Sequence, residues 1–205
     1  MFKCAHISDV HFRSLKRHDE YKIVFEKVFE NLKKENDLDA IFIGGDIVHS
    51  KTQGITPELI DILNWWFTSM ADIAPTYVIL GNHDGLILNE NRQDAITPIV
   101  NALNNKNIFL YKQSGVYPLA INNTGLKLNW CVFSCFDEKN WSTVKPISEE
   151  INIACFHGAV TGSKTDVDWE LEGEVKSTFF DDFDFGFLGD IHKKQYIDAE
   201  KRIAY

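Results

Sequence analysis

The sequence lacks any long apolar stretch. No run of hydrophobic residues approaches the ~18–20 that a membrane-spanning helix requires, and the first residues, MFKCAHISD, begin a strand pattern at once. We therefore expect neither a membrane span nor a cleavable signal peptide. The four cysteines form no CxxC pair, which favours buried free thiols in a reducing cytoplasm over disulfides or a thiolate metal site.

Basic residues are also scarce relative to acidic ones. The chain has 21 Lys and Arg against 30 Asp and Glu, so its net charge is 21 − 30 = −9. This balance argues against a protein that binds nucleic acid through a basic surface. An acidic protein can still act on phosphodiesters when bound metal ions supply the local positive charge.

The chain does have the size and composition of one folded domain. Its 205 residues, 44% hydrophobic and 25% charged, suffice for a single α/β domain with a buried core. The first half alternates strand and helix patterns. Apolar residues recur at spacings of three and four over 21–32 and 57–70, and Thr56 and Pro57 provide an N-cap and a first helical residue for the second of these helices. Residues 91–104 are expected to form a third helix, and 107–112 a strand.

The second half reads as mostly strands. Short alternating runs on both sides of NNTG (122–125) predict a hairpin, and INIACFH and FDFGFL predict two further strands. Residues 195–205 predict a last hairpin. The stretch 161–177 is the least regular and is expected to be a surface loop.

Polar residues cluster at the ends of five predicted strands. In an α/β sheet the carboxyl ends of the strands line the crevice where ligands bind, so residues far apart in the sequence can converge there. A single His or Asp after a strand is usually an ordinary loop residue, but the ordered set is specific. It reads Asp9 and His11, then Asp46 and His49, then Asn82, His83 and Asp84, then His157, then Asp190 and His192.

These motifs resemble those of the calcineurin-like metallophosphoesterases. In order, they are DxH, GGDxxH, GNHD, a strand-terminal His and GDxH. The resemblance covers essentially the whole chain and is strongest to the SbcD-type nuclease subunit of the double-strand-break repair complex. It implies an α/β fold, a four-layer α/β/β/α sandwich with two mixed β-sheets. It also implies a single nuclease domain over residues 1–205, without the downstream strand and DNA-capping segment of relatives, so that the chain is either minimal or a fragment.

The resemblance further implies a site for two metal ions. Asp9, His11, Asp46 and His192 would hold one ion, and Asp46 would bridge to a second ion held by Asn82, His157 and Asp190. Imidazole, carboxylate and amide donors suit Mn²⁺, Mg²⁺, Fe²⁺ or Zn²⁺. Two such ions bring +4 and the three aspartates −3, leaving the site near +1. His83 would face the substrate phosphate, with His49 and Asp84 positioning His83 or the strand.

Two positions depart from the motifs of the resembled phosphatases. His49 stands where many of them have an Asp, which favours a nuclease. Asp190 stands where a His ligand is expected, which makes the site harder and shifts preference toward Mn²⁺ or Mg²⁺. If the chain stays extended after the strand, Asp190 and His192 face the same cluster, because residues i and i+2 point to one side.

The leading hypothesis is therefore a dinuclear metal-dependent DNA nuclease, exo- or endonucleolytic, of the repair and recombination type. The alternatives are a phosphodiesterase or phosphatase for small substrates, and a binding scaffold without turnover. The expected partners are DNA, an SMC-like ATPase subunit and a second copy in a homodimer. The expected location is the cytoplasm, the nucleoid included, or the host cytoplasm for a viral protein.

Overall fold

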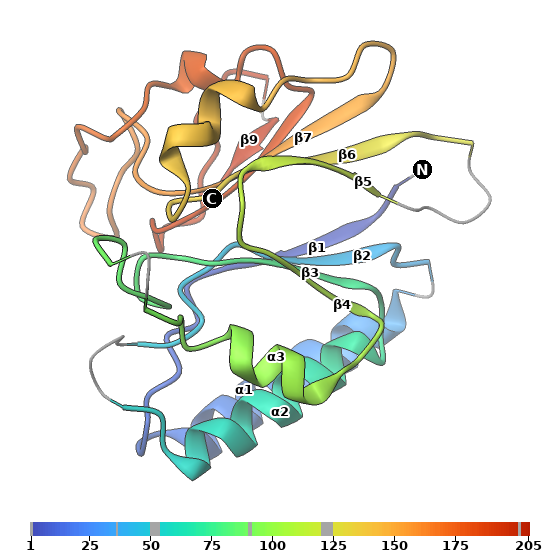
Figure 1. Ribbon diagram of the computed structural model, residues 1–205, viewed down its shortest axis with the longest axis vertical. Helices are drawn as coiled ribbons and strands as arrows, with labels where there is room; N and C mark the ends of the chain where they lie inside the picture. The colour runs from blue at the N-terminus through green and yellow to red at the C-terminus, as the bar shows by residue number, and fades with distance from the viewer. Residues whose placement is uncertain (1, 36, 50–53, 90–91, 120–124, 201) are drawn as a thin grey trace.

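The protein is a sandwich of two β-sheets stacked face to face, with helices against the outer face of one sheet (Figure 1). This computed structural model describes residues 2–35, 37–49, 54–89, 92–119, 125–200 and 202–205. Within these ranges no helix is long and apolar enough to cross a bilayer.

The first sheet is built from the alternating half of the sequence. Its strands run in the order β1 (Cys4–Ile7), β2 (Ala40–Ile43), β3 (Thr76–Ile79) and β4 (Ile108–Tyr111), and all three pairings are parallel. Helices α1 (His18–Lys34), α2 (Pro57–Ala71) and α3 (Thr97–Leu103) cover its outer face (Figure 1). The connections are the helical crossovers that parallel strands require.

The start of α2 confirms the predicted cap. The Thr56 hydroxyl accepts the Leu59 backbone N–H at 3.2 Å, and Pro57 opens the helix. The third helix is shorter than predicted because the Asp94 side chain caps its start. Its carboxylate accepts the N–H groups of Ile96 and Thr97 at 3.0 and 2.6 Å, so the helix begins only at Thr97.

The second sheet is mixed. Strand β5 (Gly115–Leu119) pairs antiparallel with β6 (Leu128–Phe133), and β7 (Ile151–His157), β8 (Phe185–Gly189) and β9 (Ile203–Ala204) continue in parallel. The predicted turn residues 122–124 lie outside the described residues. The last segment closes on itself as predicted, since Ile197 donates to Ile203 and Tyr205 to Gln195, each at 3.0 Å.

The predicted α/β fold of two stacked sheets is confirmed, with two refinements. The first sheet is parallel rather than mixed over its described strands. The layer outside the second sheet is made of loops and two 3₁₀-helices, η1 (Glu138–Thr143) and η2 (Ser177–Phe180), in place of α-helices. The predicted loop 161–177 also has some order, because Lys164 bridges Glu170 across a narrow turn.

Three apolar layers hold the sandwich together. Between the sheets, Phe42 stacks on Trp130 with ring centroids 5.2 Å apart and lies 5.6 Å from Phe187. A second layer, including Trp66 and Phe67, fills the space between the first sheet and its helices. The third covers the outer face of the second sheet. These layers fix the strands rigidly, and so fix the positions of the loops that follow them.

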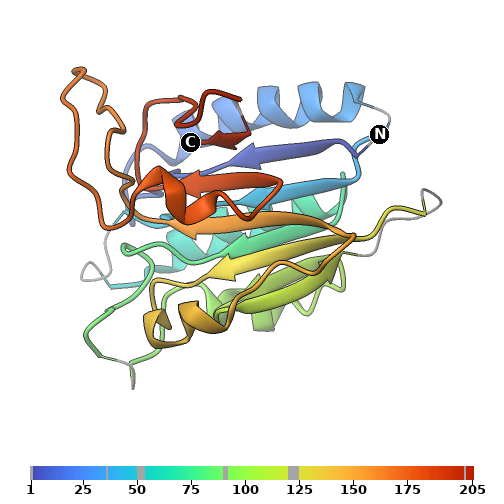
Figure 2. The same cartoon turned by 90° about the horizontal axis from the view of Figure 1, so that it is seen from above.

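The parallel strands of both sheets end at the same side of the molecule. Figure 2 shows their arrowheads together at one end, with the loops gathered beyond them. This end carries every candidate ligand that the sequence motifs single out.

We expect Trp66→Ala to lower the free energy of unfolding by about 3–5 kcal/mol, because it empties a fully buried site between α2 and the first sheet. Trp169→Ala is the matched control, since the Trp169 side chain is 70% exposed, and it should change stability by less than about 1 kcal/mol. Urea unfolding of both variants measures the difference. Equal losses would contradict the placement of Trp66 in the core.

Candidate metal centre

The candidate ligands converge from five strand ends. Asp9 and His11 follow β1, Asp46 follows β2, and Asn82 and His83 follow β3. From the other sheet, His157 is the last residue of β7, and Asp190 and His192 follow β8. Three overlapping groups have ligand atoms within 4.8 Å of one another: Asp9 with His11 and His192, His11 with Asp46 and His83, and Asp9 with Asp46 and His157.

Asp46 lies at the centre of these groups. Its side chain is almost completely buried, and its Oδ1 accepts the backbone N–H of His83 at 2.8 Å. The Nε2 atoms of His157 and His11 lie 3.3 and 3.6 Å from its two oxygens. Burial opposes ionisation, but the hydrogen bond and charge of His157 outweigh it and lower the pKa of Asp46 below its ordinary value. The group is therefore an anion shared by both sheets.

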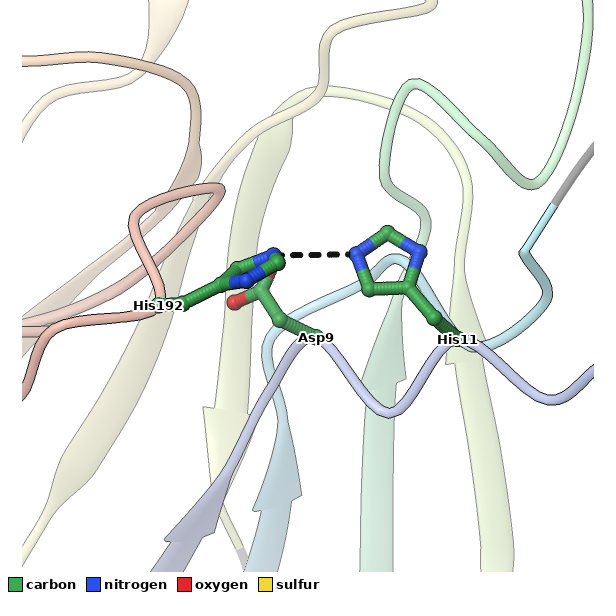
Figure 3. Close-up of side chains that lie close together, drawn as sticks. All are labelled: Asp9, His11 and His192. Atoms are coloured by element: carbon green, nitrogen blue, oxygen red, sulfur yellow. Dashed lines mark hydrogen bonds between the residues drawn. The ribbon is translucent and has the colours of Figure 1, made fainter. Parts of the chain in front are cut away.

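The first group joins two imidazoles and a carboxylate. The Nε2 atoms of His11 and His192 lie 3.1 Å apart, with Asp9 beside them (Figure 3). Burial lowers the pKa of His11 below its ordinary value, although the Asp46 charge opposes the shift. A neutral imidazole is the form that binds metal, so this arrangement fits a cation between the two rings and Asp9.

His157 anchors the second group. Its Nδ1 donates to the Gly44 carbonyl oxygen at 2.6 Å, which turns Nε2 toward Asp46 and, at 4.0 Å, toward Asp190. Burial alone would depress the pKa of His157, but the Asp46 hydrogen bond and charge raise it to about 9. The buried Nε2 lies 3.3 Å from the Asp46 Oδ1 and has no other hydrogen-bond partner among the described residues. A bound cation satisfies such a nitrogen and takes the place of its proton, so the residues present fit a second ion.

Asp190 joins the two groups through its backbone. Its N–H donates to both Asp9 oxygens at 3.0 and 3.1 Å, and its own Oδ1 accepts from the Asn82 amide at 3.4 Å. The expected extended conformation is wrong here, because Asp190 has φ 97°. The side chain reaches the cluster by this left-handed turn rather than by strand alternation. Burial, together with Asp46 and Asp9, raises the pKa of Asp190 above its ordinary value against the opposing charge of His157.

His83 faces the pocket, and His49 holds it through its backbone. The His83 Nδ1 donates to the His49 carbonyl oxygen at 2.6 Å, which leaves Nε2 on the pocket side, 4.0 Å from Asp46. The two imidazole rings do not hydrogen-bond each other, since their centroids are 6.3 Å apart. Burial, with the charges of Arg13 and His83, lowers the pKa of His49.

Asp84 does not reach the pocket. It is fully buried, and it accepts the backbone N–H groups of Ile47, Val48 and Gly81 at 2.9, 3.0 and 2.8 Å. These bonds tie the loop after β3 to the loop after β2, so Asp84 positions His83 and Asp46 relative to each other. Burial nevertheless raises the pKa of Asp84 to about 7, although the hydrogen bonds from Gly81 and Val48 lower it.

The pocket also contains residues that the motifs did not indicate. Arg13, Arg17 and Tyr21 line it together with most of the candidate ligands, around a volume of about 480 Å³. The Tyr21 hydroxyl donates to the His11 carbonyl oxygen at 2.7 Å. The only sequence signal was the pair of arginines that closely follows the first motif, in HFRSLKR. By contrast, His6 packs against Phe187 between the sheets, and lies outside the three ligand groups.

Comparison with known proteins gives consistent matches. A model of the family described as calcineurin-like phosphoesterase matches residues 2–194. "Uncharacterized protein R555" of Acanthamoeba polyphaga mimivirus is 37% identical over 215 residues, covering 98% of this chain but 15% of the relative. "Putative phosphoesterase 244L" of Invertebrate iridescent virus 6 is 32% identical over 83 residues, which is 40% of this chain and 28% of that protein. The chain thus spans a small part of the curated relatives it matches.

The crystal structure of the Pseudomonas putida nuclease MPE aligns with 82% of this chain and 66% of its own, at 15% identity and a TM-score of 0.40.

We expect Asp84→Asn to destabilise the metal-stripped protein by about 1–3 kcal/mol, because an amide NH₂ would face a backbone N–H in a buried site. The difference in unfolding free energy between the wild type and Asp84→Asn should depend on pH. Because folding raises the Asp84 pKa from 3.8 to about 7, the wild type loses stability as pH rises through this window, whereas the variant has no such proton.

Urea unfolding at about pH 5 and about pH 8 tests this expectation, since the titrations of the other groups cancel in the difference. The advantage of the wild type over Asp84→Asn should shrink at the higher pH. An advantage that stays constant would mean that Asp84 titrates near its ordinary pKa.

Proposed function

The chain belongs to the calcineurin-like phosphoesterase family, and on that premise we propose that it is a metal-dependent nuclease that hydrolyses phosphodiester bonds of DNA. The family assignment and the cluster of imidazoles and carboxylates support a metal-dependent phosphoesterase. The choice of DNA as substrate is the step that we add.

Seven residues would hold the two ions. Asp9, His11, Asp46 and His192 would hold the first, and Asp46, Asn82, His157 and Asp190 the second. When bound, the ions neutralise the phosphate oxygens and supply a nucleophilic water at neutral pH. We propose Mn²⁺ as the preferred ion, with Mg²⁺, Fe²⁺ and Zn²⁺ as alternatives, because the donors are imidazole nitrogens and carboxylate oxygens and Asp190 adds a hard oxygen.

His83 is the residue best placed to act on the substrate. Its side chain is 43% exposed, and its Nδ1–H is committed to the His49 carbonyl oxygen. The other ring nitrogen, Nε2, therefore faces the pocket beside Asp46. From there, when the ring carries a proton on both nitrogens, Nε2 can donate a hydrogen bond to a phosphate oxygen, or that proton to the leaving oxygen of the scissile bond.

The observation that carries the choice of DNA is the pair of arginines in the pocket wall. Two ions suffice to bind one phosphate, whereas Arg13 and Arg17 add positive charge beside them. Such charge is useful when the substrate continues as further phosphates, as a polynucleotide does. Arg17 is held by Glu20, with its nitrogens 2.8 and 2.7 Å from one carboxylate oxygen, so Arg13 is the better residue to test.

We expect Arg13→Gln to reduce cleavage of DNA about tenfold and to change hydrolysis of bis-nitrophenyl phosphate less than about twofold, because one lost phosphate contact affects only the longer substrate. Lys16→Gln is the control, since Lys16 is exposed on the same loop but does not line the pocket. Rates on single- and double-stranded DNA and on the small diester are compared.

The same assay separates the alternative functions. Hydrolysis of the small diester or of a nitrophenyl monoester without DNA cleavage would replace the nuclease by a small-substrate phosphodiesterase or phosphatase. Metal binding without turnover of any substrate would favour a binding scaffold.

We expect His83→Ala to keep metal binding and to lose at least ~10²-fold in cleavage rate, the usual contribution of a positioned acid–base group. His49→Ala should lose much less, because the backbone carbonyl that orients His83 remains in the variant. Calorimetric titration with Mn²⁺ and single-turnover cleavage are measured on both. Loss of an ion in His83→Ala would make His83 a ligand, and equal losses of rate would give the His49 imidazole a direct role.

We further propose that tight DNA binding requires a second protein surface. The net charge of −9 leaves the chain poorly suited to hold a long polyanion alone. An SMC-like ATPase subunit or a second copy of the chain are the partners that we propose, in a role in DNA repair or recombination. Both remain expectations from the sequence resemblance.

A further inference from the structure

A second hollow meets the candidate metal centre beside its first group of ligands. It has a volume of about 730 Å³, and its wall includes Asp9 and His192, which also line the pocket that Arg13 lines. From there it extends along β1, past His6 and Cys4, toward the last hairpin of the chain. A ligand that continues beyond the metal centre therefore has room in this second hollow, which we call the edge groove.

The segment that begins at His192 forms one wall of the edge groove. His192, Lys194 and Tyr196 all line this wall, and all three are exposed. The groove thus presents a candidate metal ligand, then a cation, then an aromatic ring. These are the groups that hold a polynucleotide, since cations bind its phosphates and aromatic rings stack on its bases.

Contacts with two other segments hold the backbone of this wall in place. Lys164 donates its N–H to the Gln195 Oε1 at 2.9 Å, and the Gln195 Nε2 donates to the Lys164 carbonyl oxygen at 2.8 Å. Lys193 forms an ion pair with Asp168, farther along the loop that contains Lys164. Tyr196 in turn forms a β-bridge with the last strand, β9. The exposed side chains therefore stand on a fixed backbone, which lowers the entropy lost when a ligand binds.

Lys194 and Tyr196 are both available to a ligand. Within the described part of the chain, the Lys194 ammonium makes no hydrogen bond or ion pair, and the Tyr196 ring, 53% exposed, stacks on no other aromatic ring. Arg202 lines the groove as well, but its Nε lies 2.9 Å from the Glu200 carboxylate and 3.5 Å from that of Asp198. Lys194 is therefore the cation that an anionic ligand would meet here.

We propose that the edge groove binds the DNA strand beyond the scissile phosphate, where Lys194 contacts a neighbouring phosphate and Tyr196 stacks on an unpaired base. The inference rests on the nuclease function proposed above and adds a substrate subsite to it. Positive charge would then accompany the strand in both hollows, from Arg13 in one and Lys194 in the other. Because stacking tolerates any base, the groove would favour strands over small diesters without reading their sequence.

Steady-state cleavage of a single-stranded oligonucleotide in Mn²⁺ by the full chain tests the proposal. Tyr196→Ala should raise KM about tenfold and leave kcat nearly unchanged, because a stacking contact away from the scissile bond binds ground state and transition state alike. Tyr196→Phe should retain the wild-type KM. Lys194→Gln should also raise KM, and should reduce the slope of log KM against log salt concentration by about 0.7, the effect of one lost phosphate contact on a single strand. Hydrolysis of bis-nitrophenyl phosphate should change less than about twofold in each variant.

Two variants outside the groove control for lost charge and for a lost ring. Lys193→Gln removes the same charge from the adjacent residue, and Trp169→Ala removes an exposed ring from the neighbouring loop. Neither side chain lines the groove, so both variants should keep the wild-type KM. Thermal unfolding and calorimetric titration with Mn²⁺ verify that every variant is folded and binds metal as the wild type does.

The outcomes distinguish this inference from the function proposed above. A wild-type chain that cleaves the oligonucleotide, with an unchanged KM in Tyr196→Ala and Lys194→Gln, would overturn the edge groove alone. An equal rise of KM in Lys193→Gln would overturn the role of Lys194, by showing a general effect of net charge. A wild-type chain that cleaves no DNA would overturn the nuclease, and this inference with it.

Discussion

The buried carboxylate of Asp46 is the group on which the rest of the site depends. A charge that is 2% exposed must find partners or be neutralised. Asp46 finds them on three other strand ends, in the backbone N–H of His83, the imidazole of His157 and the imidazole of His11. Because His157 comes from the second sheet, the same carboxylate links both halves of the sandwich at its functional end.

The backbone around Asp46 is strained in a way that serves the site. Among the described residues, eight other than glycine have positive φ, and four of these are candidate ligands: Asp9, His11, Asp46 and Asp190. Such conformations persist only where the surroundings enforce them. Glycines make the enforcement possible, since a side chain on Gly81 would overlap Asp46 and one on Gly189 would overlap the Gly44 carbonyl and Ser8. The strain thus concentrates where ligands must face one another.

Charge is divided between the site and the rest of the molecule. The chain as a whole is acidic, yet its pocket is lined by Arg13 and Arg17 as well as by the acids of the candidate metal centre. An acidic centre attracts divalent cations, and the ions reverse its local sign toward a phosphate. The arginines add positive charge that does not depend on the ions. This division explains how an acidic protein can present a site for an anionic substrate.

The sequence by itself determined the strand and helix order, the α2 cap and the candidate ligands that the fold brings to one end of the sheets, because those features depend on local periodicity and on motifs that follow strands. Tertiary structure alone decided the features that arise between segments. It revealed that His49 acts on His83 through a carbonyl, that Asp84 is a buried anchor rather than a pocket residue, and that Asp190 reaches the cluster by a left-handed turn. It also brought Arg13 to the wall of the pocket. None of these leaves a local signal, because backbone contacts, burial and proximity across 100 residues are set by the packing of the two sheets.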